Sequence, residues 1–178
     1  MMLEQLSIIC AQKIKQKHTH PETANVNIMA YALGVYFNFF ATLLLVVLVG
    51  WATNELIDTI LVMILFNVIR FFSGGYHFKS LDVCVVISVI LFSIVPQLSL
   101  STIGITLLTL SSALIFLWRA PAYRTDTTRL NPRFHPYFKV TAVLLALINL
   151  HFQSELYAWV LLLQAITMLF VLKGGESA

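Results

Sequence analysis

Apolar residues fall into six long runs along the chain, and polar residues gather in the short stretches between them. The runs cover residues 28–51, 56–72, 81–95, 98–118, 138–152 and 156–172. A helix needs about 20 mostly apolar residues to cross the hydrocarbon core of a bilayer. Each run therefore predicts a transmembrane helix. The second and fifth runs are marginal in length, so they fit either a short crossing or a partly re-entrant segment.

The stretch before the first run has a different pattern, in which apolar and polar residues alternate at helical spacing. Apolar side chains, among them Leu6 and Cys10, share one side, and three lysines stand near the end of the stretch. This pattern predicts an amphipathic helix over residues 3–17 that lies in the membrane interface rather than crossing the bilayer. The residue before Pro21 disfavours helical backbone, so we expect the helix to end before that proline.

Composition supports a membrane fold. Of the 178 residues, 59% are hydrophobic and 11% are charged, whereas a soluble globular domain is roughly half apolar and about a quarter charged. Helices satisfy their own backbone hydrogen bonds in lipid. We therefore expect an all-α, polytopic membrane helix bundle of about six transmembrane helices with an N-terminal amphipathic interfacial helix. We assign residues 1–178 to a single membrane domain, with the arm in 1–24, the bundle in 25–172 and a short tail in 173–178.

The basic residues follow the same six-run division. All 11 Lys and Arg residues lie in the N-terminal arm, around the second-to-third and fourth-to-fifth connections, and in the tail. Basic residues mark the cytoplasmic side of a membrane protein. This alternation predicts a multi-pass protein with both termini in the cytoplasm. The net charge of +3 is too small and too scattered to suggest nucleic-acid binding, so the expected surrounding partner is the lipid membrane.

The second-to-third connection holds the residues best suited to chemistry, between Arg70 and Cys84. Gly74 and Gly75 should end the second transmembrane helix, because glycine permits turn conformations and is costly inside a helix. Ser80 is a suitable N-cap for the third helix, which would place Cys84 in its first turns. A thiolate is favoured near a helix N-terminus and beside an imidazole.

The spacing between His77 and Cys84 limits how the two can act together. On one continuous helix they would share a face but stand about 10 Å apart. Proton transfer needs an approach of about 3 Å, so a catalytic pair requires His77 on a loop folded back over the start of the third helix. The alternative is structural: Cys84 as a small buried hydrophobe and His77 as a polar anchor at the interface.

These motifs resemble a known family. Arg70, the following Gly-Gly pair, His77 and Cys84 are similar to the signature of the accessory gene regulator B family, which has an arginine, a Gly-Gly-x-His and a cysteine seven residues later. Residues 120–132, which contain an early proline and end in Asn-Pro, resemble the second cytoplasmic loop of that family. The chain length, the N-terminal arm and the hydrophobic profile match over nearly the whole chain.

The resemblance implies a quorum-sensing endopeptidase of the bacterial cell membrane that processes a small precursor peptide, acts as a homodimer and needs no cofactor or metal. His77 and Cys84 inherit the catalytic roles, with an acyl-enzyme on Cys84. A thiol or hydroxyl of the precursor then attacks the thioester of this acyl-enzyme and closes a thiolactone or lactone ring. Basic loops would attract an acidic precursor tail. The residues assigned to substrate binding are Arg70, Gly74, Gly75, Arg124 and Asp126.

Several residues keep a second interpretation. Arg70 either binds a substrate carboxylate or extends to the interface as a membrane anchor. Asp126 could orient His77 from the other loop, and Asp82 is more typical of a first-turn acid favoured by the helix dipole than of a triad member. The alternative for the whole chain is a small membrane peptide transporter, or a scaffold with no catalytic activity. A transporter would favour ionisable residues near the middle of the runs, and the runs carry none there.

Three further polar or sulfur-containing side chains have structural interpretations. Asn38 and Asn67 lie inside apolar runs, where hydrogen bonding between helices is the default expectation. Cys10, on the apolar face of the arm, is expected to pack. The remaining histidines have no metal-ligand spacing with any cysteine or carboxylate, so we expect no metal site.

Overall fold

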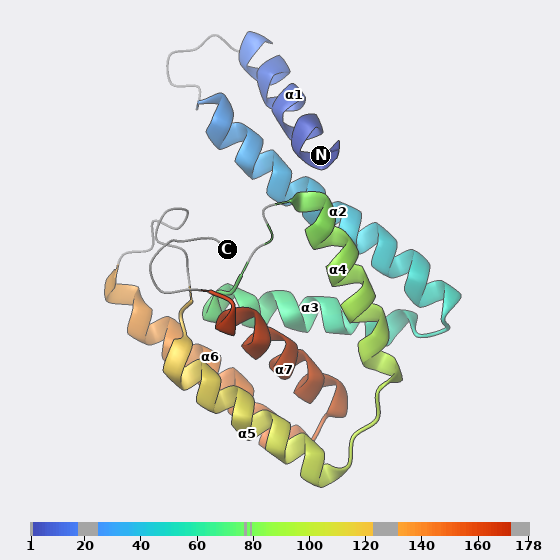
Figure 1. Ribbon diagram of the computed structural model, residues 1–178, viewed down its shortest axis with the longest axis vertical. Helices are drawn as coiled ribbons and strands as arrows, with labels where there is room; N and C mark the ends of the chain where they lie inside the picture. Colours follow the sequence, from blue (N-terminus) through green and yellow to red (C-terminus); the bar gives the residue numbers. More distant parts are fainter. Residues whose placement is uncertain (1, 18–24, 77, 79, 123–131, 172–178) are drawn as a thin grey trace. The chain divides into compact units, whose positions relative to one another are not determined.

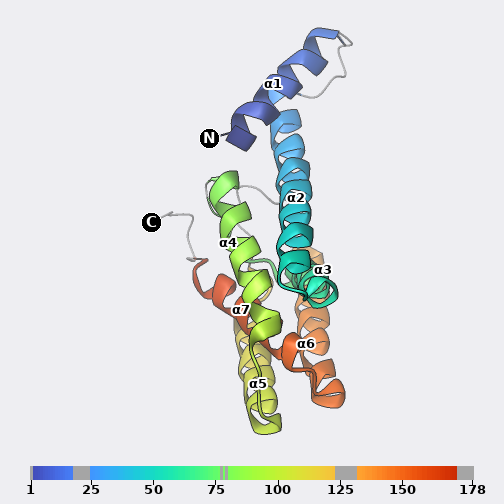
Figure 2. The same cartoon turned by 90° about the vertical axis from the view of Figure 1, so that its right-hand side faces the viewer.

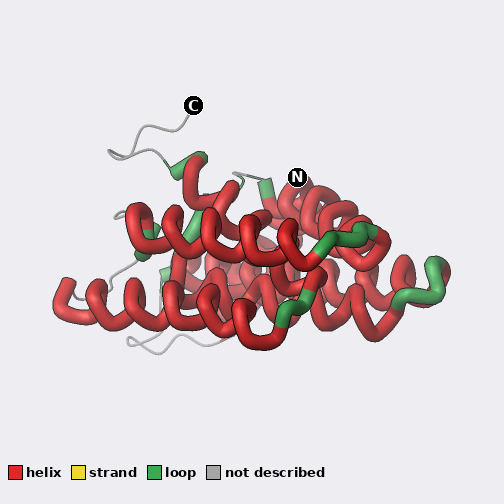
Figure 3. Tube along the Cα trace, turned by 90° about the horizontal axis from the view of Figure 1, so that it is seen from below, coloured by secondary structure: helices red, strands yellow, loops and turns green. Residues whose placement is uncertain are grey.

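The computed structural model describes residues 2–17, 25–76, 78, 80–122 and 132–171. These residues form helices joined by short connections (Figure 3). The α-helices are α1 Met2–Lys17, α2 Val26–Ala52, α3 Leu56–Ser73, α4 Leu81–Ile94, α5 Thr102–Arg119, α6 His135–Phe152 and α7 Glu155–Leu169, and the short 3-10 helices are η1 Val95–Gln97 and η2 Pro132–Phe134. The arm and the six apolar runs thus each form a helix, which confirms the predicted all-α membrane bundle.

Three helices, α2, α3 and α5, are long and apolar enough to cross a membrane by length and composition. The second run, predicted to be marginal, therefore forms a full-length candidate span. The short apolar helices are instead α4 and α7, with 14 and 15 residues. The six crossings themselves remain predictions.

The start of α5 differs from the prediction, which placed it at residue 98. Ser101 has extended backbone, and its Oγ accepts the N–H of Gly104 at 3.2 Å, so that the helix begins at Thr102. An N-cap of this kind satisfies an amide that the helix itself leaves free. Leu100 donates its N–H to the carboxylate of Glu155 at 2.8 Å, and the starts of α5 and α7 therefore lie together.

The described helices divide into two compact units. Unit 1 comprises residues 1–56 and 77–93, which contain α1, α2 and nearly all of α4. Unit 2 comprises residues 57–76 and 94–178, which contain α3 and the helices from α5 to α7. The chain passes from unit 2 back to unit 1 in the middle of the connection that carries the candidate chemistry.

In unit 1, α1 lies beside the first half of α2, as both Figure 1 and Figure 2 show. Ser7 and Ala11 are the buried residues of α1. Gly34 of α2 leaves room for α4, because a Cβ there would lie 3.0 Å from Leu81 Cδ1 of α4, whereas Ser7 Oγ of α1 would lie at an ordinary contact distance of 3.7 Å. The position of α1 in the membrane interface remains a prediction, and the structure adds the surface against which it packs.

In unit 2, α5, α6 and α7 pack closely through small side chains, as is common between membrane helices. Buried alanines on these helices are Ala113, Ala142, Ala146, Ala158 and Ala165. The buried amide of Asn149 on α6 donates to Thr109 Oγ1 on α5 at 3.0 Å. At the far end of α5, Arg119 Nη1 donates to the carbonyl of Val171 at 3.4 Å. Both ends of α5 and α7 are therefore paired, and the two helices run in the same direction.

Candidate active site

The turn that ends α3 depends on two glycines whose backbone conformations side chains rarely adopt. Gly74 has φ +73° and Gly75 has φ +145°, in the left-handed half of the map that favours glycine. A Cβ on Gly74 would lie 2.5 Å from the carbonyl oxygen of Ala122, and a Cβ on Gly75 would lie 2.7 Å from Thr167 Oγ1. Both conformation and space require glycine here, and the predicted helix end is confirmed.

Two distant segments of unit 2 hold this turn. Gly74 forms a short parallel bridge with Ala122, which follows α5. The N–H of Gly75 donates to the Ala122 carbonyl at 2.9 Å, and the Ala122 N–H donates to the carbonyl of the residue before Gly74 at 2.8 Å. Tyr76 donates its N–H to the carbonyl of Thr167 near the end of α7, at 3.1 Å. The C-terminal ends of α3, α5 and α7 therefore meet around the turn (Figure 1).

Gln164 fixes the same turn from inside α7. Its side chain is fully buried, and its Nε2 donates to Ser73 Oγ at 2.8 Å and to the carbonyl of Gly74. A buried polar group without partners is costly, so these bonds couple the amide to the turn. Gln164 is not among the site residues that the sequence predicts. The available signal was an amide within the apolar run 156–172.

Arg70 points back into the turn that follows it. Its Nη2 donates to the carbonyl of Tyr76, and its guanidinium lies 5.5 Å from the ring centroid of Phe66. A cation in the last turn of a helix also interacts favourably with the helix dipole. Arg70 thus orders the end of α3, a role that neither sequence interpretation included. Its binding of substrate remains a prediction.

The start of α4 matches the predicted cap. Ser80 Oγ accepts the N–H of Val83 at 3.4 Å, and the Ser80 carbonyl accepts the N–H of Cys84 at 3.1 Å. Cys84 is the fourth residue of α4, half-buried and with a free thiol. The N-terminal end of a helix carries a partial positive charge, so Cys84 lies where negative charge is favoured.

Helices α1 and α2 hold the first turn of α4 from outside. The carbonyl of Leu81 accepts from Asn38 Nδ2 at 3.1 Å, and its N–H donates to Glu4 Oε1 at 3.3 Å. The carboxylate of Asp82 accepts the N–H groups of Met2 and of the next residue of α1, at 2.8 and 3.1 Å. Asn38 therefore makes the expected bond between helices. Asp82 is the expected first-turn acid, and its oxygens are engaged by α1.

Three predicted site residues, His77, Arg124 and Asp126, lie outside the residues that the structure describes. Their catalytic and substrate-binding roles remain predictions. Arg70 and the two glycines belong to unit 2, whereas Cys84 belongs to unit 1. The structure therefore describes the candidate site in two parts, and the chain joins them at His77.

Asn67 departs from the expectation of a bond between helices. Its Nδ2 donates to the carbonyl of Met63, one turn earlier in its own helix, at 2.7 Å. A short polar side chain can bond to its own backbone in this way when no partner helix offers an acceptor. Cys10 is half-buried and free on α1. Across the described part of the chain, no three His, Cys, Asp or Glu side chains are grouped so that they could hold a metal ion.

Comparison with known proteins shows which family the chain resembles. The sequence profile described as Accessory gene regulator B matches residues 7–172. An AgrB-like protein of Halalkalibacterium halodurans is 23% identical over 193 aligned positions, which cover 99% of this chain and 98% of that protein. No solved structure shows a significant match.

Proposed function

The chain belongs to the accessory gene regulator B family, and from this premise we propose that it is a cysteine endopeptidase that processes a small precursor peptide in the bacterial cell membrane. Cys84 is the nucleophile and His77 is the general base. The observation that carries the proposal is the position of Cys84, a free and half-buried thiol in the capped first turns of α4. The partial positive charge at a helix N-terminus favours a negatively charged attacking group.

The reaction needs only these two side chains and the substrate. The imidazole of His77 accepts the proton of Cys84 Sγ, and the sulfur attacks the carbonyl carbon of the scissile peptide bond. When the C–N bond breaks, the imidazolium returns the proton to the leaving amine. The acyl group remains on Cys84 as a thioester.

A nucleophile within the precursor completes the cycle. Its thiol or hydroxyl gives its proton to the imidazole of His77 and attacks the thioester. The C–S bond breaks, a thiolactone or lactone ring closes, and the Cys84 sulfur leaves and takes the proton back from His77. The thioester conserves the energy of the cleaved bond, and a tethered nucleophile outcompetes water through its high effective concentration. The product is a cyclic autoinducing peptide of the quorum-sensing type.

Substrate binding is proposed at the basic loops that flank the pair. Arg70, Gly74 and Gly75 would bind the precursor from the first loop, and Arg124 and Asp126 from the second. An acidic precursor tail fits loops of this charge. Replacement of Arg124 together with the two other arginines of that loop, Arg129 and Arg133, by Gln should weaken cleavage, most strongly at low salt where screening is least. Unchanged cleavage at every salt concentration would leave these arginines without a substrate role.

The proposed topology places both termini and both basic loops in the cytoplasm, within a homodimer. The meeting of the C-terminal ends of α3, α5 and α7 around one turn supports the proposed alternation of crossings, because these three ends then lie on one side of the membrane. In intact cells, an external thiol reagent should label cysteines introduced near Asn54 and Ser154 but not cysteines introduced near Ser73 or Thr127. Labelling of the second pair would overturn this topology.

The test of the activity is conversion of a co-expressed precursor by variants of the pair, measured by mass spectrometry. Cys84→Ala should abolish conversion, and Cys84→Ser should be nearly inactive because a serine hydroxyl stays protonated at neutral pH. His77→Ala should slow conversion by roughly 10²–10⁴, the usual range for a general base. Cys10→Ala is the matched control and should convert normally. Conversion by Cys84→Ala at the wild-type rate would favour the transporter or the scaffold instead.

A further inference from the structure

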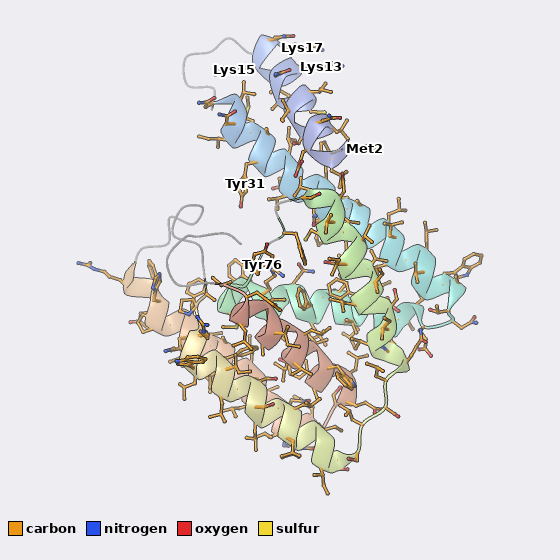
Figure 4. The ribbon with its side chains drawn as sticks, viewed as in Figure 1. Met2, Lys13, Lys15, Lys17, Tyr31 and Tyr76 are labelled. Atoms are coloured by element: carbon orange, nitrogen blue, oxygen red, sulfur yellow. The ribbon has the colours of Figure 1, made fainter. Side chains whose placement is uncertain are left out.

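The first turns of α1 and α4 are joined by two acidic side chains that cross in opposite directions. Asp82 of α4 accepts the N–H groups of Met2 and Leu3 at 2.8 and 3.1 Å. Glu4 of α1 accepts the N–H of Leu81 at 3.3 Å. Each helix therefore supplies a carboxylate to the other's N-terminus. Figure 4 shows Met2 at the end of α1 opposite to its three lysines.

The physical reason for this exchange lies in the exposed amides of helix ends. The first N–H groups of a helix have no partner within it, and the aligned peptide dipoles leave a partial positive charge there. Two helix starts placed side by side would repel one another. The carboxylates of Glu4 and Asp82 satisfy the amides and offset both partial charges, so the pair stabilises the contact between α1 and α4.

A second observation ties this contact to the position of the thiol. The carbonyl of Leu81 is held by Asn38 of α2 at 3.1 Å, while its N–H is held by Glu4. The first turn of α4 is closed by the capping residue Ser80, because its carbonyl accepts the N–H of Cys84. The backbone that carries Cys84 is thus fixed by contacts with α1 and α2 within two or three residues of the sulfur-bearing position.

We propose that Glu4 and Asp82 are positioning residues for Cys84, and that α1 is a working part of the active site through them. This inference rests on the proposed function, since it assigns the contact a catalytic purpose. Loss of either carboxylate should loosen the first turn of α4 and displace the nucleophile. Substrate binding should change little, because neither carboxylate is assigned to the substrate.

The kinetic test uses the full-length protein in detergent or vesicles, with a purified precursor peptide. Glu4→Ala and Asp82→Ala should each lower kcat by roughly 10- to 100-fold, since a small displacement of a reacting group has an effect of this size. KM should stay within about twofold, as expected when only a transition-state interaction is lost. Asp82→Asn, which keeps an acceptor oxygen and is a good cap, should recover most of the activity. If Asp82→Ala does not fold, Glu4→Ala, which should lose activity, and Asp82→Asn, which should keep it, still give the comparison.

The matched control is Asp58→Ala, which removes an acid from the first turn of α3 in the other unit. It should leave kcat unchanged. A wild-type kcat in both Glu4→Ala and Asp82→Ala, or an equal fall in Asp58→Ala, would overturn the positioning role. The Glu4→Ala/Asp82→Ala double variant should lose less than the product of the single losses, because the two residues act on one contact.

Hydrogen exchange separates failure of this inference from failure of the proposed function. The amides of residues 81–84 should exchange faster in Glu4→Ala and Asp82→Ala than in the wild type or in Asp58→Ala. If the wild type cleaves no precursor but the exchange rises, the protease proposal fails and the contact between helices stands. If the exchange is unchanged, the carboxylates do not hold this turn and the inference fails, whatever the protease activity.

Discussion

The two described parts of the candidate site are fixed by different means. The turn at Gly74 and Gly75 depends on space: both residues have positive φ, and a Cβ on Gly74 would meet the backbone of Ala122 at 2.5 Å. The start of α4 depends instead on side-chain hydrogen bonds to its backbone, from Glu4 and Asn38. A substitution that creates a steric clash should cost much of the stability at once, whereas the loss of one of several separate hydrogen bonds should cost only part of it.

This difference suits the roles proposed for the two parts. The turn leads directly to the residue proposed as general base, and it is anchored by two distant segments of unit 2, the residue Ala122 and helix α7. The start of α4 carries the nucleophile, and several separate contacts define its position. We therefore expect substitutions in the turn to remove folded protein and activity together, and substitutions around α4 to lower activity in a graded manner.

The largest effect should come from Gly74→Ala. The new methyl group would collide with main-chain atoms of Ala122 that cannot move away as a side chain can, and the positive φ would add strain. We expect a destabilisation of about 2–6 kcal/mol, the sum of the usual costs of strain and overpacking. Thermal unfolding in detergent, followed by precursor conversion, measures it.

Gly104→Ala serves as the control for this substitution, because its nearest neighbour is the end of the Leu100 side chain at 3.2 Å and alanine is the better helix former. It should be close to neutral. A Gly74→Ala variant as stable as Gly104→Ala would show that the turn has no steric requirement for glycine.

The next largest effect should come from Gln164→Leu, which leaves Ser73 Oγ and the Gly74 carbonyl without their shared donor. Loss of a buried partner costs about 1–3 kcal/mol. Ser73→Ala should therefore cost less in the Gln164→Leu background than in the wild type, because the bond between the two side chains is already lost there. Unfolding temperatures of the single and double variants test this. Strictly additive losses would argue against the pairing.

The smallest effects are expected from Asn38 and Asn67, two asparagines that both lie within apolar helices. Asn38→Leu removes a bond between helices and should cost about 0.6–1 kcal/mol and lower activity modestly. Asn67→Leu removes a bond within one helix and should be near neutral, because the helix backbone keeps its own partners. The same unfolding and conversion assays apply to both. Equal losses from the two variants would contradict a specific role for Asn38 at α4.

Much of the fold could be predicted because its main signals are local. Apolar runs predict the helices, and Ser80 and the Gly-Gly pair mark the helix start and end that the structure confirms. One helix start was predicted wrongly, because a capping residue inside an apolar run sets the start of the helix. The apolar run beginning at residue 98 predicts an earlier start for α5 than the Ser101 cap allows.

The contacts that complete the site could not be predicted in the same way. Glu4 and Leu81 are 77 residues apart in sequence, and Gln164 and Ser73 are 91 residues apart. No spacing rule within one sequence relates such pairs, because they meet only when separate helices pack. Gln164 was visible as an amide in an apolar run, but its partner was not. Arg70 was singled out, yet its bond to the Tyr76 carbonyl depends on the shape of the turn.

The most direct test of the central claim is detection of the acyl-enzyme on Cys84. Purified protein is mixed with a precursor whose ring-closing residue is replaced by alanine, so that the thioester cannot cyclise and should accumulate. Intact mass spectrometry should show the protein heavier by the N-terminal precursor fragment, and peptide mapping should place that mass on Cys84. The Cys84→Ala protein should show no increase. Cleavage of the precursor by Cys84→Ala, or an acyl group on any other residue, would contradict the account.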